Sequence, residues 1–190
     1  MRVSLRPSTL VAMGRGVGKR TRQLLVFVHV AVSVGWMGAG AANVVLAMTA
    51  GYTASAEVRQ VCYQMIDQVD GFVVIPIAFA ALASGVLLCL VTPWGLARYW
   101  WVLVKLVLTV AVIGYSTFGL GTWVEDSIAA STRGVESPVA GQLAYGAGLN
   151  IAAFLFMTWL SVAKPWGKTP WAPASPRRGH RPVAPRLAAG

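Results

Sequence analysis

The sequence predicts an all-α fold, a polytopic membrane four-helix bundle with antiparallel helices and both termini in the cytoplasm. Of its 190 residues, 56% are apolar and 12% are charged, whereas a soluble domain has roughly 45–50% and 25%. Four apolar stretches are each long enough to cross a hydrocarbon layer of about 30 Å, which takes roughly 20 residues. They cover about residues 24–48, 72–91, 99–121 and 144–163.

The first stretch follows a basic tail, residues 1–22, and begins a membrane region over 23–164. Ala54-Ser55-Ala56 resembles a signal cleavage site. The apolar run is longer than the roughly 7 to 15 residues of a signal peptide, so we expect an uncleaved span.

Polar connections join the spans. Residues 51–70 follow the first span, and their apolar positions are compatible with a short amphipathic helix at the membrane interface. Pro93 and Gly95 end the second span in a turn of only a few residues. So short a turn predicts that the second and third spans are antiparallel neighbours. Gly134 predicts a loop over residues 122–143 before the fourth span.

Basic residues indicate the orientation. Six Lys and Arg lie in the N-terminal tail, one between the second and third spans and six after the fourth, against one in each remaining connection. This bias predicts both termini on the cytoplasmic side of the cell inner (plasma) membrane. The net charge of +10 therefore reflects topology in a lipid bilayer, and no nucleic-acid partner is expected. Residues 165–190 are rich in Pro and Arg, a composition that predicts a disordered cytoplasmic tail.

Two ionisable side chains fall inside the predicted spans, where a Lys costs about 2.5–3.5 kcal/mol at the membrane centre. His29 and Lys105 each lie seven residues beyond an arginine, Arg22 and Arg98. At 1.5 Å per residue, both lie about 10 Å into their helices. We therefore expect the two side chains at one depth, facing each other inside the bundle.

The face of the first span that carries His29 is polar and aromatic. Trp36, Gly40 and Asn43 follow it by seven, eleven and fourteen residues, which places them on the same helical face. This face is expected to contact protein. The other spans offer polar partners at Ser84, Thr109, Ser116, Asn150 and Ser161.

The pair supports two interpretations. In the functional one, His29 ligates a metal ion or haem iron and Lys105 holds an anionic group such as a propionate. In the structural one, His29 forms a hydrogen bond to a neighbouring helix and Lys105 extends its ammonium to lipid phosphates.

The segment from His29 through Trp36 and Gly38 to Gly40, followed by Tyr99-Trp-Trp-Val-Leu-Val-Lys105, resembles a pattern in small bacterial four-span membrane proteins. With its Thr-Pro-Trp-Gly turn at 92–95, the chain looks like an uncharacterised actinobacterial family of predicted integral membrane proteins. It is more distantly similar to HemJ-type protoporphyrinogen oxidases and CopD-type membrane domains.

The HemJ resemblance implies that haem is bound and that His29 and Lys105 are functional, with Trp36 and Asn43 as further cofactor-binding candidates. The chain departs from that pattern where Asn43 and Tyr115-Ser116 stand in place of additional histidines. Two histidine ligands to one haem would then require a homo-oligomer, and a single-ligand haem is the alternative.

The sequence thus favours a small integral membrane protein of unknown activity with a non-catalytic accessory or scaffold role, and it leans against an enzyme. The first alternative is a haem-binding or redox membrane protein that uses His29 and Lys105. The second is copper or ion transport.

Overall fold

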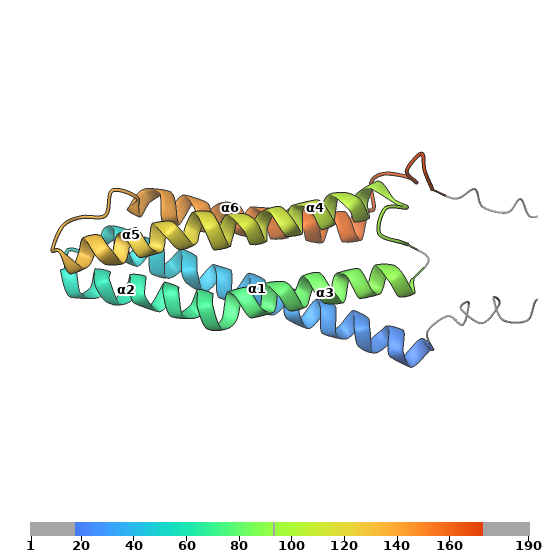
Figure 1. The fold of residues 1–190 in the computed structure, drawn as a ribbon, viewed down its shortest axis with the longest axis horizontal. Coiled ribbons are helices and arrows are strands. Elements are labelled where there is room, and N and C mark those ends of the chain that lie inside the picture. Colours follow the sequence, from blue (N-terminus) through green and yellow to red (C-terminus); the bar gives the residue numbers. More distant parts are fainter. Residues whose placement is uncertain (1–17, 93, 173–190) are drawn as a thin grey trace, which may run out of the picture.

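The computed structural model describes residues 18–92 and 94–172, and this part of the chain is helical, without strands. Four long helical rods form a bundle (Figure 1). Each is long and apolar enough to cross a membrane. In chain order the rods are α1 (Lys19–Tyr52); α2 (Ala56–Val69), the π-helix η2 (Asp70–Val74) and α3 (Ile75–Val91); α4 (Trp100–Gly114), the π-helix η3 (Tyr115–Leu120) and α5 (Gly121–Thr132); and α6 (Ala140–Ala163).

The first three rods are longer than the predicted spans. The rod from Ala56 to Val91 has 36 residues, about 54 Å of helix, against about 30 Å of hydrocarbon. The amphipathic helix expected within 51–70 is present as α2, and it continues through η2 into α3. The predicted loop over 122–143 is too long, since the helices leave only residues 133–139 between them.

Local sequence explains why these polar connections are helical. Ser55 caps α2, and its hydroxyl accepts a hydrogen bond from the Val58 amide at 3.2 Å. One face of α2 packs against the bundle with Cys62, Tyr63 and Ile66 buried, whereas Val58, Val61 and Met65 are exposed on its other face. On α5, Val124 and Ser127 are buried in the same way. Helix–helix packing thus accounts for the buried face of α2.

We call this part of the bundle the closed end. Its core joins α1, α2, α5 and α6 in one cluster of buried residues: Ala47, Ala50, Cys62, Tyr63, Ile66, Leu120, Val124 and Leu143. A second cluster lies near the middle of the bundle around Trp36, Ala78 and Phe154. In these cores α1 packs mainly against the rod from Ala56 to Val91 and against α6.

The opposite end, which we call the open end, contains the start of α1, the connection 92–99 and the end of α6. Here the N-terminal part of α1 diverges from α4 and α6 (Figure 1). The first and last described residues both lie at this end (Figure 1).

Residues 165–172 are not disordered, contrary to the expectation for 165–190. Thr169 Oγ1 and Trp171 Nε1 both donate to the Ala97 carbonyl, at 2.6 and 2.8 Å. The Trp171 ring also packs on Trp100 with centroids 5.5 Å apart. Hydrogen bonds and one aromatic contact thus order a segment that has no core of its own. Most of the predicted N-terminal tail (1–17), Pro93 and residues 173–190 lie outside the described residues.

Candidate functional site

His29 and Lys105 line the same cavity at the open end, with a volume of about 340 Å³. Ligand pockets in proteins are typically about 300–1,000 Å³. Its walls come from α1, α3, α4, α6 and the 92–99 connection, and include Arg22, Cys89, Trp94 and Trp101. Both residues also line an adjoining cavity of about 230 Å³. The two residues that the sequence paired are therefore neighbours in the fold, and we call the larger space the open-end cavity.

His29 is oriented by a hydroxyl from the facing helix. Its Nδ1 lies 3.0 Å from Ser84 Oγ, and that hydroxyl donates to the Ala81 carbonyl at 3.1 Å. Because a serine has one hydroxyl proton, this network assigns the imidazole proton to Nδ1. Nε2 then carries a lone pair for a ligand or a proton.

The helix that faces His29 allows this close approach because residue 85 is glycine. A Cβ at Gly85 would lie 3.1 Å from His29 Cε1, closer than the ring tolerates without a shift. The absence of a side chain there leaves the imidazole room against α3, at the edge of the open-end cavity.

Lys105 has an equivalent arrangement between α4 and α6. Its Nζ donates to Ser161 Oγ at 2.6 Å, and Ser161 Oγ donates to the Met157 carbonyl at 3.0 Å. Among the described residues, Lys105 forms no salt bridge with a carboxylate. The ion pair in this part of the chain joins Arg59 to Glu136 at 3.8 Å. The ammonium points to protein and cavity, where its charge favours an anion.

Trp36 and Asn43 lie elsewhere along α1. Trp36 is 3% exposed and packs edge-on against Phe154, with ring centroids 4.6 Å apart. It borders the adjoining cavity together with His29 and Lys105. Asn43 lies beyond this aromatic pair and donates from Nδ2 to Asp70 Oδ1 at 2.7 Å. The structure thus groups His29 with Lys105, places Trp36 at the border, and separates Asn43 from them.

Asp70 is the polar residue that the sequence analysis did not select, because it was assigned to the outer connection. It begins η2, and Val74, Ala78 and Ala81 continue the buried face of the same rod. Their spacing of four, four and three residues is helical. Extending that pattern backwards from the second span was the available signal for an inward-facing carboxylate.

Few side chains at this site could ligate a metal ion. Within residues 18–92 and 94–172, no group of three or more His, Cys, Asp and Glu side chains is arranged to hold a metal ion. His29 offers one imidazole nitrogen, and the second histidine of the chain, His180, lies outside the described residues. A protein-only metal centre therefore lacks ligands here.

Comparison with protein-family models, curated proteins and solved structures gives no match for this chain. Its function must be argued from its own residues.

Proposed function

We propose that this protein is a multi-pass protein of the plasma membrane, with antiparallel helices and both termini in the cytoplasm. The lysines and arginines that flank the bundle support this orientation. Both the start of α1 and the segment after α6 lie at the open end (Figure 1). The open-end cavity would then face the cytoplasmic half of the membrane.

We further propose that the open-end cavity binds an amphipathic, anionic small molecule, with a haem-type tetrapyrrole as the first candidate. One observation carries this proposal: His29 Nε2 and the Lys105 ammonium, which has no carboxylate partner among the described residues, border one apolar-walled cavity. A purely structural role would require neither the cavity nor the uncompensated charge. An anionic group on the ligand would neutralise Lys105, and apolar faces would fit the Leu and Val side chains around it.

Among the described residues of this cavity, His29 would hold the haem iron. His29 has a hydroxyl partner that fixes its ring, as ligating histidines commonly have. Lys105 would pair with a propionate, and Gly85 leaves the imidazole room against α3. Bound in this way, haem would supply a redox-active iron. This chain's own contribution is to orient the imidazole and to hold the carboxylate.

The test is purification in mild detergent from haem-replete cells, followed by an absorption scan and a pyridine haemochromogen assay. We expect a Soret band that is lost in His29→Ala and weakened in Lys105→Met. His180→Ala is the matched control, because it removes the other histidine and should leave the band unchanged.

A colourless wild-type preparation would contradict the haem assignment. Native mass spectrometry would then test the broader proposal, since an anionic ligand should be retained by wild-type protein and lost from Lys105→Met. If neither protein retains a ligand, the accessory or scaffold role becomes the better account.

A further inference from the structure

A second polar space lies on the other side of the Trp36–Phe154 pair. Its volume is about 30 Å³, enough for about one or two waters. We call it the polar chamber. Four polar side chains, one from each rod, line it: Asn43 from α1, Asp70 from η2, Ser116 from η3 and Asn150 from α6.

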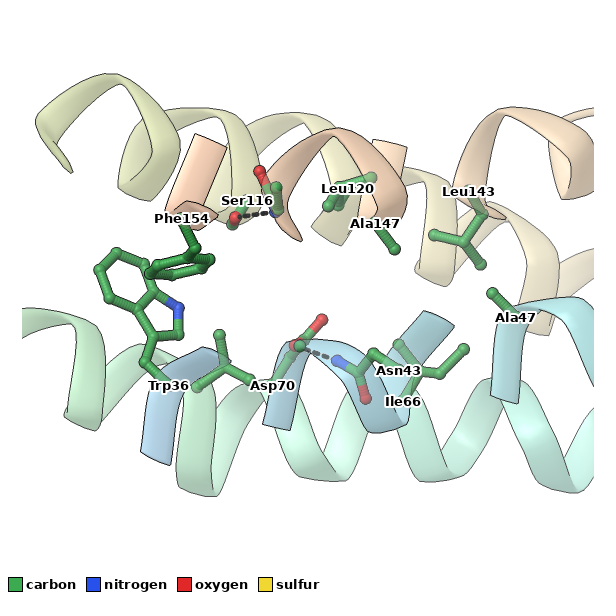
Figure 2. Close-up of a pocket in the computed structure, with 13 residues that line it drawn as sticks. Trp36, Asn43, Ala47, Ile66, Asp70, Ser116, Leu120, Leu143, Ala147 and Phe154 are labelled. Atoms are coloured by element: carbon green, nitrogen blue, oxygen red, sulfur yellow. Dashed lines mark hydrogen bonds between the residues drawn. The ribbon is translucent and has the colours of Figure 1, made fainter. Parts of the chain in front are cut away.

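Both π-helical segments meet at the polar chamber. Asp70 and Val74 come from η2, and Ser116 and Leu120 come from η3. π-helical turns are rare and frequent at functional sites, because the wider turn redirects side chains. Two of them on different rods bring a carboxylate and a hydroxyl to one space (Figure 2).

Polar side chains in the chamber form two pairs. Asn43 Nδ2 donates to Asp70 Oδ1 at 2.7 Å, and Asn150 Nδ2 donates to Ser116 Oγ at 2.8 Å. The second oxygen of Asp70 points into the space between the two pairs (Figure 2). Both amides use their nitrogens as donors, so the oxygens are left to receive further partners.

The chamber contains a buried oxygen atom that no hydrogen-bond donor reaches. Asn43 is 7% exposed, and its Oδ1 is buried without a hydrogen-bond partner. Asp70 has no salt bridge, since the ion pair within the described part of the chain is Arg59 with Glu136. A carboxylate without a counter-charge inside a membrane bundle is costly. A positive species would remove that cost.

We propose that the polar chamber binds one small monovalent cation, a sodium ion or a hydronium ion, through oxygens of Asp70 and its polar neighbours. The single carboxylate balances one positive charge, whereas a divalent ion would leave one charge uncompensated and demand more oxygen ligands. The small volume admits an ion with little or no water of its own.

The polar chamber lies far from the open end of the bundle and is separate from the open-end cavity. Asp70 precedes Val91, the last residue of α3, by 21 residues, about 32 Å along the rod. This distance matches the hydrocarbon thickness of about 30 Å. If the span ends at Val91, as in the proposed membrane topology, the chamber lies near the far boundary of the membrane. Trp36 and Phe154 border both this chamber and the cavity next to His29, and so stand between them.

Other titratable groups near Asp70 are few. Asp67, one turn earlier on α2, is exposed and acts electrostatically on Asp70. Tyr63 of α2 and Tyr115 of η3 belong to the adjacent closed-end packing. The facing part of α1, after His29, contains no charged side chain, and α6 contains none.

The test measures thermal unfolding of the full-length protein in detergent while sodium chloride replaces choline chloride at constant ionic strength. Sodium binding predicts a midpoint that rises with sodium concentration in wild type and stays constant in Asp70→Asn. The hydronium alternative predicts no sodium effect and a midpoint that rises as pH falls from mildly alkaline to mildly acidic, because the buried charge is neutralised. That response too should be lost in Asp70→Asn.

Asp67→Asn is the matched control, since it removes an exposed carboxylate from the same rod. Its unfolding midpoint should respond to sodium and pH as that of wild type does. Size-exclusion chromatography verifies that Asp70→Asn is folded. If that variant does not fold, equilibrium binding of radioactive sodium to wild type and to Asn150→Ala, together with the wild-type pH response, decides. The proposal is overturned if wild type and Asp70→Asn respond alike to sodium and to pH, or if wild type responds to neither.

Discussion

The two ends of the bundle differ in how completely their helices pack. At the closed end, Tyr63 and Ala50 are 0% exposed, and the cluster around them joins four helices. At the open end, α1 diverges and a cavity of about 340 Å³ remains between the rods. The closed end resembles the core of a soluble protein, where close packing supplies stability. The open end gives up packing for space and for ionisable side chains.

This contrast suggests a division of roles. Side chains that hold the bundle together are concentrated away from the residues that border the open-end cavity. Substitutions at the closed end should therefore reduce stability, and substitutions at the open end should change binding with a smaller loss of stability. Three substitutions test this division.

Tyr63→Ala should have the largest effect on stability. The side chain is fully buried at the centre of the closed-end cluster, and removal of a buried aromatic ring costs about 3–5 kcal/mol. We expect a much lower unfolding midpoint or loss of monodisperse protein. Tyr52→Ala is the control, because Tyr52 is 86% exposed. Similar midpoints for the two variants would show that the closed end is not the stabilising core.

Gly146→Ala should have an intermediate effect. A Cβ at Gly146 would lie 2.5 Å from both Tyr115 Oη and Leu120 Cδ2, so these two side chains of η3 would have to shift. Overpacking of this kind costs about 1–3 kcal/mol. Gly148→Ala on the same helix is the matched control, since nothing lies within 4 Å of its position. The difference between the two unfolding midpoints measures how tightly η3 is held, and equal midpoints would contradict this packing.

Ser84→Ala at the open end should have the smallest effect on stability, about 0.5–1.5 kcal/mol, because it removes one hydrogen bond to His29 Nδ1. Its effect on binding should be larger than its effect on unfolding. If haem is the ligand, loss of the group that orients the imidazole should weaken haem affinity about 10–100-fold. Haem titration into protein depleted of ligand measures this, with Thr49→Ala as control, because the Thr49 hydroxyl donates to the Val45 carbonyl within α1, away from the cavity. Unchanged affinity would remove Ser84 from the site.

Much of the helical architecture follows from the sequence, because apolar length is a strong signal. The four apolar helices were predicted, and the structure confirms four helices of membrane-spanning length and composition. Their ends were not predicted well. Polar residues in α2 and α5 look like loops when only hydropathy is considered, yet their buried faces at Tyr63 and Val124 pack against neighbouring rods. Such packing depends on tertiary contacts that a single segment does not contain.

The site was predictable in part for the same reason. Equal depth brought His29 and Lys105 to one cavity, as the arginine spacing indicated. Asn43 lies on the same helical face as His29 but is not part of that site, because it lies about 21 Å farther along the helix axis than His29. Asp70 was missed because it was placed in the polar connection 51–70, and the π-helical turn that orients it has no reliable sequence signature.

The two hydrogen bonds to the Ala97 carbonyl link positions 72 and 74 residues apart in the chain. During synthesis, the turn between α3 and α4 must therefore wait for Thr169 and Trp171 to emerge from the ribosome before it gains these bonds. Trp94 and Trp101 from this region form part of the open-end cavity wall. Translation thus completes the rim of the cavity last, and a reporter fused before residue 172 would interrupt that final step.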